Sequence, residues 1–167
     1  MATLSGRPEE GVRWTRPDGW HVTLRFLGDA DVGEATEAFR SMADAPGLGP
    51  VDAEMGPSTG RFGPRVLHVP VAGLEPLTAA AVVATGGVGR PPDARGFSGH
   101  LTLGRAKARA GTNLTPWSGL PLAARWPVDE VTLVASHPGR DGPRYEVVDR
   151  LSLVGPDAVG GDAGDRG

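Results

Sequence analysis

The chain has 167 residues, no cysteine and a formal net charge of −3. A chain without cysteine has no disulfide framework, thiolate nucleophile or zinc–thiolate site, and a small negative charge argues against a broad nucleic-acid track, which needs a positive surface. No apolar run approaches the roughly 20 residues of a membrane span, and the N-terminus lacks the basic-then-apolar order of a signal peptide, so we expect a cytoplasmic protein.

The first part of the chain predicts an arm, a strand and a helix. Residues 1–13 are polar and lack an alternating apolar pattern, which predicts an irregular arm. Alternating apolar residues predict a strand over 19–27. Asp31 is typical of a helix N-cap, and apolar residues at helical spacing after it predict a helix over 32–44.

Two strands and a second helix are expected next. Val51–Met55 and Arg65–Val71 are rich in apolar and β-branched residues and flank the turn-rich stretch 56–60, which predicts a hairpin. Residues 74–85 are rich in alanine and end at a glycine pair, which predicts a helix.

The second half predicts an antiparallel β region. Strands are expected at 99–106, 121–126, 129–136 and 144–151. The last two should form a hairpin, because the turn residues 138–142 separate them. Residues 155–167 are mainly glycine, aspartate and small residues, which predicts a disordered tail.

A histidine followed two residues later by a threonine occurs twice, as His21 with Thr23 and His100 with Thr102. Residues i and i+2 of a strand share one face, so each pair should present both side chains together while the apolar neighbours point into the core. One such pair alone is more often an ordinary hydrogen-bonding strand feature. Two copies in apolar strands indicate one composite site.

The residue types in these pairs suit phosphoryl chemistry. The reference pKa of histidine, about 6.5, allows one imidazole to accept a proton while another donates one near neutral pH. A threonine hydroxyl hydrogen-bonds a phosphate oxygen. Basic residues are also concentrated over 90–109, around the second pair, and their field favours an anion there.

The other chemistry-bearing residues have ordinary structural interpretations. We expect His68 to stand on a sheet face and hydrogen-bond locally, with lining of the site as the lesser alternative, and His137 to lie in a surface turn. Arg25 shares the parity of His21, but an exposed strand arginine is the simpler interpretation. The four histidines lack the short spacing of metal ligands, so no metal site is predicted.

The two motif segments, His21-Val22-Thr23-Leu24-Arg25-Phe26-Leu27-Gly28 and His100-Leu101-Thr102-Leu103-Gly104-Arg105, resemble the signature motifs of the two-histidine (2H) phosphoesterases. Three further segments resemble the RNA 2′,3′-cyclic phosphodiesterase, or LigT-like, branch, also known as the 2′-5′ RNA ligase family: Arg13-Trp14, Trp126-Pro127-Val128 and Gly142-Pro143-Arg144-Tyr145-Glu146-Val147. The resemblance covers about residues 12–152. It implies an α+β fold, a single domain over 14–154 with two pseudo-symmetric lobes of antiparallel sheet flanked by helices, and a cleft that receives one motif from each lobe.

The resemblance also implies an activity and roles for the motif residues. His21 would be the proton donor to the leaving 3′ oxygen and His100 the proton acceptor that activates water, with Thr23 and Thr102 orienting the phosphate. The implied reaction is hydrolysis of RNA 2′,3′-cyclic phosphate ends to 2′-phosphate, with reverse 2′-5′ ligation of RNA ends. RNA termini or cyclic nucleotides would be the partners of a monomer that uses no metal or cofactor. The residues themselves leave open which histidine is the acid and which the base.

Arg105 stands where the family places an arginine near the phosphate or ribose. Strict alternation sends Arg105 to the face opposite His100, so it belongs to the site only if a bulge at Gly104 re-aims the side chain. Without the bulge it is a solvent or core-rim residue.

Relatives usually begin with an apolar strand and a helix ahead of the Arg-Trp pair, whereas only residues 1–12 precede it here. We therefore expect the opening strand and helix to be missing. Two alternatives to RNA-end hydrolysis stay open: a catalytically impaired protein that binds a nucleotide or RNA end, and a phosphodiesterase acting on another cyclic phosphate.

Overall fold

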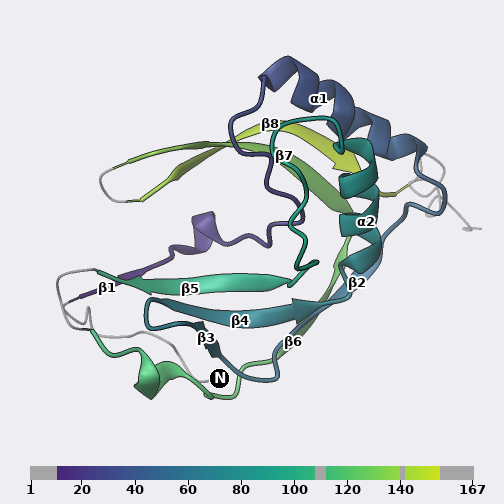
Figure 1. Ribbon diagram of the computed structural model, residues 1–167. Coiled ribbons are helices and arrows are strands. Elements are labelled where there is room, and N and C mark those ends of the chain that lie inside the picture. The colour runs from purple at the N-terminus through teal and green to yellow at the C-terminus, as the bar shows by residue number, and fades with distance from the viewer. Residues whose placement is uncertain (1–10, 108–111, 140–141, 155–167) are drawn as a thin grey trace, which may run out of the picture. The chain divides into compact units, whose positions relative to one another are not determined.

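The computed structural model describes residues 11–107, 112–139 and 142–154. Its helices are α1 (Val32–Arg40) and α2 (Glu75–Ala84), and its strands are β1 (Val12–Trp14), β2 (Val51–Met55), β3 (Gly60–Phe62), β4 (Val66–Ala72), β5 (His100–Ala106), β6 (Ala124–Val128), β7 (Glu130–His137) and β8 (Arg144–Ser152). The strand pairs β1–β5, β2–β4, β3–β4, β4–β5 and β7–β8 are all antiparallel, so the α+β prediction is confirmed (Figure 1). No helix in the described part of the chain is long and apolar enough to cross a membrane.

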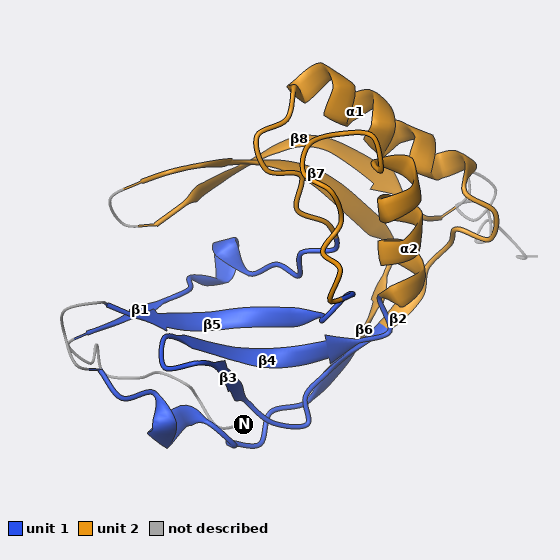
Figure 2. Ribbon diagram, in the orientation of Figure 1, with its two compact units in different colours: residues 1–24, 53–74, 96–125 blue, residues 25–52, 75–95, 126–167 orange. Residues whose placement is uncertain are grey.

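The chain divides into two compact units, coloured separately in Figure 2. Unit 1 comprises residues 1–24, 53–74 and 96–125, and unit 2 comprises residues 25–52, 75–95 and 126–167. Both paired motifs fall within unit 1. The units alternate along the sequence, so each of them is assembled from three separate segments.

Strands β2 and β6 belong partly to each unit. Unit 1 contains the whole of β1, β3, β4 and β5, within a sheet whose strand order is β1-β5-β4-β2-β6 and in which β3 pairs with β4 as a hairpin. Strands β4 and β5 lie side by side at its centre (Figure 1). The buried strand residues Val12, Leu67, Val69 and Leu103 form a hydrophobic cluster with Leu114 from the loop that follows β5. Trp14 and Trp117 pack against this cluster with nearly perpendicular rings.

Unit 2 contains both helices and the β7–β8 hairpin. Helix α1 begins after Asp31, whose carboxylate accepts a hydrogen bond from the backbone N–H of Glu34 at 3.0 Å. A short 3₁₀ turn over Ser41–Asp44 continues it, so the predicted helix over 32–44 is confirmed. The apolar face of α1 buries Ala35 and Phe39, and α2 buries Leu77 and Ala81.

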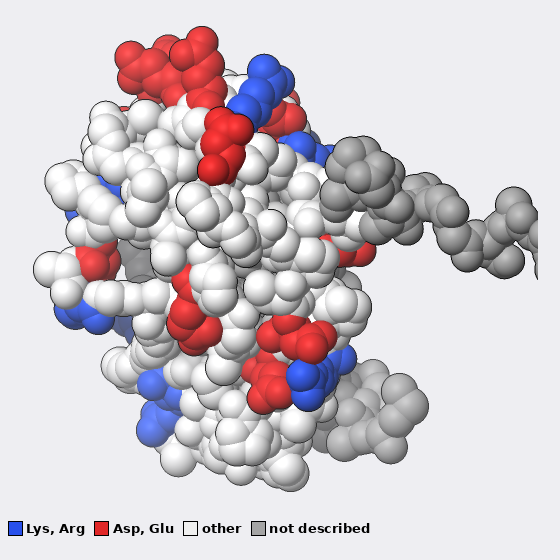
Figure 3. Space-filling view, turned by 90° about the vertical axis from the view of Figure 1, so that its right-hand side faces the viewer, with Lys and Arg blue, Asp and Glu red and all other residues white. Residues whose placement is uncertain are grey.

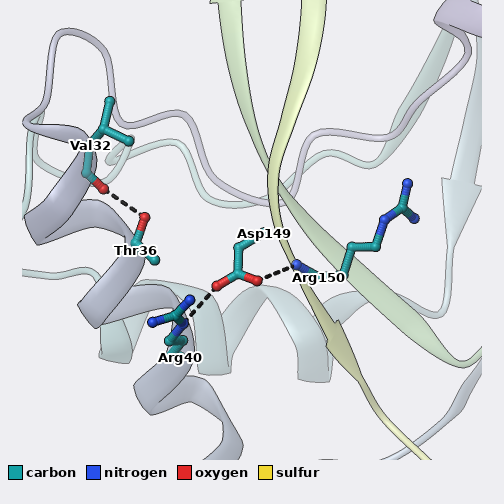
Figure 4. Close-up of polar contacts among 5 residues, drawn as sticks. All are labelled: Val32, Thr36, Arg40, Asp149 and Arg150. Atoms are coloured by element: carbon teal, nitrogen blue, oxygen red, sulfur yellow. Dashed lines mark hydrogen bonds and ion pairs between the residues drawn. The ribbon is translucent and has the colours of Figure 1, made fainter.

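A polar contact ties α1 to β8 within unit 2 (Figure 4). Arg40 Nε donates to Asp149 Oδ2 at 2.7 Å, and the backbone N–H of Arg150 donates to Asp149 Oδ1 at 2.8 Å. The Arg150 N–H, followed by the Arg40 guanidinium, lowers the pKa of the Asp149 carboxyl. The Thr36 hydroxyl donates a hydrogen bond within α1, to the backbone carbonyl of Val32.

The structure corrects three of the predicted elements. The strand over 19–27 is wrong, because Pro17–Gly19 is a 3₁₀ turn and only one isolated bridge, from Val22, follows it. Residues 12–13, assigned to an irregular arm, form β1 instead. The stretch 56–60 is not a simple hairpin loop, since β3 begins at Gly60 and forms its own hairpin with β4. The rest of the arm, residues 1–10, and the tail 155–167 lie outside the described residues.

The remaining elements agree with prediction. Strand β2 has the predicted bounds, and β4, α2, β5, β7 and β8 differ from prediction by one or two residues at their ends. Strand β6 starts three residues later than predicted. These segments have clear alternation, helical spacing or turn residues, which are the signals that sequence patterns carry best.

Candidate active site

The first His-x-Thr segment lies along the edge of β5 without forming a regular strand. If the register of β1 continued, Pro17 would lie opposite Leu101, but Val22 lies there instead. The chain therefore has five extra residues in this stretch, which contains the 3₁₀ turn Pro17–Gly19. A proline and a glycine in this turn allow the excursion. The segment then returns to β5 at the position where the second motif begins.

The antiparallel bridge between Val22 and Leu101 brings the two motifs together. In antiparallel pairing the residues on either side of a bridged pair oppose one another, so His21 lies opposite Thr102 and Thr23 lies opposite His100. Directly opposed residues share a face of the sheet. Val22 and Leu101 point to the core side, and the four motif residues occupy the other side.

A bulge in β5 decides the orientation of Arg105. Leu67 pairs with Gly104, but His68 pairs with Thr102, so Leu103 is an extra residue in β5. Leu103 and Gly104 consequently both face the core, and both are buried. The alternation is then reversed: Arg105 pairs with Val66 and lies on the same face as His68, Thr102 and His100.

Gly104 makes this bulge compatible with the core. A Cβ atom at position 104 would lie 3.1 Å from Cε3 of Trp14 and 3.3 Å from Cγ1 of Val12. A larger residue would therefore press against the packed aromatic ring. The conditional prediction of a bulge at Gly104 agrees with the observed register shift beside it, although the role of Arg105 in substrate binding stays a prediction.

The two histidines are held in the same way. Nδ1 of His21 is 2.9 Å from the carbonyl oxygen of Gly19, and Nδ1 of His100 is 2.8 Å from that of Ser98. A carbonyl oxygen only accepts hydrogen bonds, so each Nδ1 carries its proton and donates it. Nε2 of each ring is then the atom that takes up or releases a proton.

His68 adds a third imidazole to this face, which is the less expected of the two positions that its sequence context allows. Its ring centroid is 5.8 Å from that of His100, and the residue is only 9% exposed. We expected His68 to hydrogen-bond locally, and its Nδ1 has no hydrogen-bond partner among the described residues. Burial, followed by the nearby His100 charge, lowers the pKa of His68.

Two other residues have structural roles. Arg25 donates from Nη1 to the carbonyl of Phe26 at 2.6 Å and from Nη2 to the carbonyl of Arg90, so it fastens a loop of unit 2. His137 is at the end of β7 and lies 3.2 Å from a carboxylate oxygen of Glu146 on the exposed hairpin. No cluster of three or more potential metal ligands is found among the residues that the structure describes.

The charge of the chain is spread out on the face drawn in Figure 3, where described basic and acidic side chains are interspersed among uncharged ones. The basic groups nearest to the motifs in the sheet register are Arg105 and Arg13, which pair directly across β5 and β1. Like charges in opposed positions repel one another, and a bound anion relieves that repulsion.

Comparison with known proteins supports the resemblance from two directions. The family model described as LigT like Phosphoesterase matches residues 2–54. No curated protein matches the sequence. Among solved structures, TT0787 of Thermus thermophilus has 26% sequence identity and a TM-score of 0.73, with 88% of this chain and 85% of that chain covered.

LigT of E. coli is also similar. Its structure in complex with 3′-AMP has 26% identity and a TM-score of 0.67, covering 90% of this chain and 85% of LigT. Its structure in complex with phosphate has 25% identity and a TM-score of 0.61, covering 90% and 84%. The family match in the N-terminal part and the likeness in fold over most of the chain confirm the predicted resemblance: the chain is similar to the LigT-like phosphoesterases of the two-histidine superfamily.

Proposed function

We propose that this protein hydrolyses 2′,3′-cyclic phosphates at RNA ends or on nucleotides to 2′-phosphates, without a metal or cofactor, and acts as a cytoplasmic monomer. The observation that carries the proposal is the Val22–Leu101 bridge, which puts both His-x-Thr pairs on one face. The occurrence of phosphate and 3′-AMP in E. coli LigT structures supports a phosphate ligand of nucleotide type.

The reaction needs one proton acceptor and one proton donor. We assign His100 as the acceptor: its Nε2 takes a proton from water while the water oxygen forms a bond to phosphorus. His21 is the donor: its Nε2 gives a proton to the 3′ oxygen as the P–O3′ bond breaks. The product has a 3′-hydroxyl and a 2′-phosphate, and the two histidines exchange protonation states. Each proton transfer contributes a factor of about 10²–10⁴ in rate.

The neighbouring side chains would hold the phosphate during this exchange. Thr23 and Thr102 lie opposite the two histidines in the register, so their hydroxyls are suited to donate to the non-bridging oxygens. Arg105, on the same face beyond Thr102, offers a planar guanidinium that matches phosphate geometry. The same groups would serve the reverse 2′-5′ ligation, in which a 5′-hydroxyl RNA end replaces water.

The test is hydrolysis of adenosine 2′,3′-cyclic phosphate and of an oligomer with a cyclic phosphate end, in the presence of a chelator, with separation of 2′- and 3′-phosphate products. We expect the 2′-phosphate, and a rate loss of about 10²-fold or more in His21→Ala and in His100→Ala. His137→Ala is the matched control, because His137 lies in the β7–β8 hairpin, and it should retain activity.

Absence of hydrolysis by the folded wild type would contradict the proposal, as would activity that survives the double change of His21 and His100 to Ala. Binding of the cyclic nucleotide without turnover would favour the alternative of a nucleotide-binding protein. Faster turnover of a cyclic phosphate that is not a nucleotide would favour the other alternative.

A further inference from the structure

An aromatic side chain stands exposed beside the candidate histidines. Phe62 is the last residue of β3 and is 43% exposed. It lies in the β3–β4 hairpin, and the register pairs it with Val66, so it is on the same face of the sheet as His68, Thr102 and His100. Large apolar side chains are normally withdrawn from water, and one that stands open at a polar site is a candidate contact for a ligand.

The ring of Phe62 is held by its neighbours. It stacks on the His68 imidazole at a centroid distance of 3.8 Å and an interplanar angle of 3°. It also lies 4.8 Å from the His100 ring at an angle of 81°. Since His68 covers one face of the Phe62 ring and His100 meets it nearly at a right angle, the exposed part of the ring lies on the side away from His68.

The support beneath Phe62 is itself fixed in place. His68 is buried, and a Cβ atom on Gly60, its partner on β3, would lie only 3.1 Å from Cε1 and 3.2 Å from Nε2 of His68. Because glycine has no Cβ atom, position 60 leaves room for the His68 imidazole. Gly60, His68 and Phe62 form a layered arrangement with one aromatic surface turned outward. The lowered pKa of His68 favours a neutral ring in this stack.

We propose that Phe62 is a stacking platform for the nucleobase attached to the ribose whose cyclic phosphate is cleaved. The proposal rests on the function proposed above and adds the recognition of the base. A nucleobase is joined to its 2′,3′-phosphate through a single ribose, so a base-binding surface must lie close to the histidine that acts on the phosphate. The Phe62 ring, which lies in van der Waals range of His100, fulfils this condition.

A flat aromatic surface fits a base better than it fits the other parts of the substrate. Ribose and phosphate are recognised by hydrogen-bond donors and charges, neither of which Phe62 supplies. Every base has a π-face, so stacking on phenylalanine accepts all four bases and favours larger ring systems. Phe62 would therefore raise the affinity for nucleotides generally and favour purines over pyrimidines.

The test compares a nucleotide with its base-free counterpart. Steady-state kinetics would be measured on adenosine and cytidine 2′,3′-cyclic phosphates and on 1-O-methylribose 2′,3′-cyclic phosphate, for the wild type, Phe62→Leu and Phe62→Tyr. We expect Phe62→Leu to raise KM for the adenosine substrate by about 5- to 100-fold, with a smaller rise for cytidine. The base-free substrate should show the same kcat/KM with wild type and Phe62→Leu, and Phe62→Tyr should keep the wild-type preference.

Equal losses on the nucleotide and the base-free substrate would overturn the inference, because Phe62 would then only position His68 and His100. No loss on either substrate would overturn it too. If the folded wild type hydrolyses none of the substrates, the proposed function is wrong. Stacking on Phe62 is then tested by binding, with calorimetry that compares the affinities for adenosine 2′-phosphate and ribose 2-phosphate. A preference for adenosine 2′-phosphate that Phe62→Leu abolishes supports stacking, and equal affinities contradict it. Thermal melting of each variant, with Phe62→Tyr as the conservative second variant, separates loss of folding from loss of stacking.

Discussion

His68 combines a buried position with a titratable ring. It is stacked on Phe62, packed against Gly60 and nearly perpendicular to the ring of His100. Burial and the like charge of His100 both oppose its protonation, and they lower its pKa below 6.5. The folded protein therefore holds this imidazole in its neutral form over a pH range in which the unfolded chain is already protonated.

This difference predicts a pH dependence of stability. Below pH 6.5 the unfolded chain binds a proton at His68 that the folded chain does not bind until the pH reaches the lowered folded-state pKa. The free energy of unfolding should thus fall as the pH drops through this window. Urea unfolding of the wild type and of His68→Phe at pH 7.5 and at pH 5 measures the effect, since phenylalanine keeps an aromatic ring and cannot titrate.

We expect the wild type to lose more stability between the two pH values than His68→Phe does. The other titrating groups are common to both proteins, so the difference between the two slopes reports on His68. Equal slopes would mean that His68 has the same pKa in the folded and the unfolded chain.

Single residues in this chain differ in how far their sequence context predicts their role. The spacing of His21 with Thr23 and of His100 with Thr102 predicts a shared face, and the structure places all four on one face by the Val22–Leu101 bridge. His68 offered no such signal, because a lone histidine in an apolar strand is compatible with either face and either role. Its proximity to His100 depends on the pairing of β4 with β5, which involves residues 30 or more positions apart.

Strand β5 contains a bulge that decides which face of the sheet its last residues occupy. The extra residue at Leu103 turns Arg105 to the face of the histidines while Leu103 and Gly104 both point inward. Strict alternation of side chains along β5 predicts the opposite face for Arg105. The only sequence signal for a bulge at this point is Gly104. The orientation of Arg105 is thus a property of the β4–β5 pair.

Substitution of Gly104 tests the bulge. Gly104→Ala brings a Cβ atom to 3.1 Å from Trp14 and 3.3 Å from Val12, and overpacking of this kind costs about 1–3 kcal/mol of stability. It should also raise KM for the cyclic phosphate, because the strand must shift next to Arg105. Chemical denaturation and steady-state kinetics measure the two effects.

The matched control is Gly87→Ala, since Gly87 is exposed, lies outside the left-handed region and has no atoms within 4 Å of the position of an added Cβ. Stability and KM should stay close to wild type in this variant. If Gly104→Ala behaves like Gly87→Ala, close packing of Trp14 against Gly104 does not limit the bulge.

The strand expected over 19–27 shows that alternation of apolar and polar residues does not by itself predict a paired strand. Its alternation is real, and it correctly separates Val22 from His21 and Thr23. Regular pairing is prevented because five extra residues, in the stretch that contains the 3₁₀ turn, offset this segment from β1, and a single bridge remains. The number of residues between β1 and the bridge at Val22 depends on tertiary structure, and the local alternation of apolar and polar residues contains no information about it.

For the whole molecule, the order of the units along the chain determines how the candidate site is assembled. The chain crosses between units after residues 24, 52, 74, 95 and 125, so neither unit is one continuous segment. The two motifs are separated by more than 70 residues and nevertheless fall in the same unit. The resemblance implied one motif from each lobe, whereas in this structure the bridge joins both motifs on the edge of β5.

Charge at the molecular scale agrees with a small anionic ligand. The formal net charge is −3, and acidic and basic side chains are interspersed on the described surface drawn in Figure 3. Binding a long nucleic acid relies on many phosphate contacts. A terminal cyclic phosphate needs only the few groups gathered around the two motifs, and its recognition does not require a basic surface.

The central claim is that one histidine donates a proton and the other accepts one in the same step. The most direct measurement is the pH profile of kcat/KM for adenosine 2′,3′-cyclic phosphate, with a chelator present, for the wild type, His21→Ala and His100→Ala. We predict a bell-shaped wild-type profile, because one imidazole must be protonated and the other neutral. The residual activity of His21→Ala should lose the alkaline limb and that of His100→Ala the acidic limb. A wild-type profile with a single limb, or a bell that persists unchanged in both variants, would contradict the account.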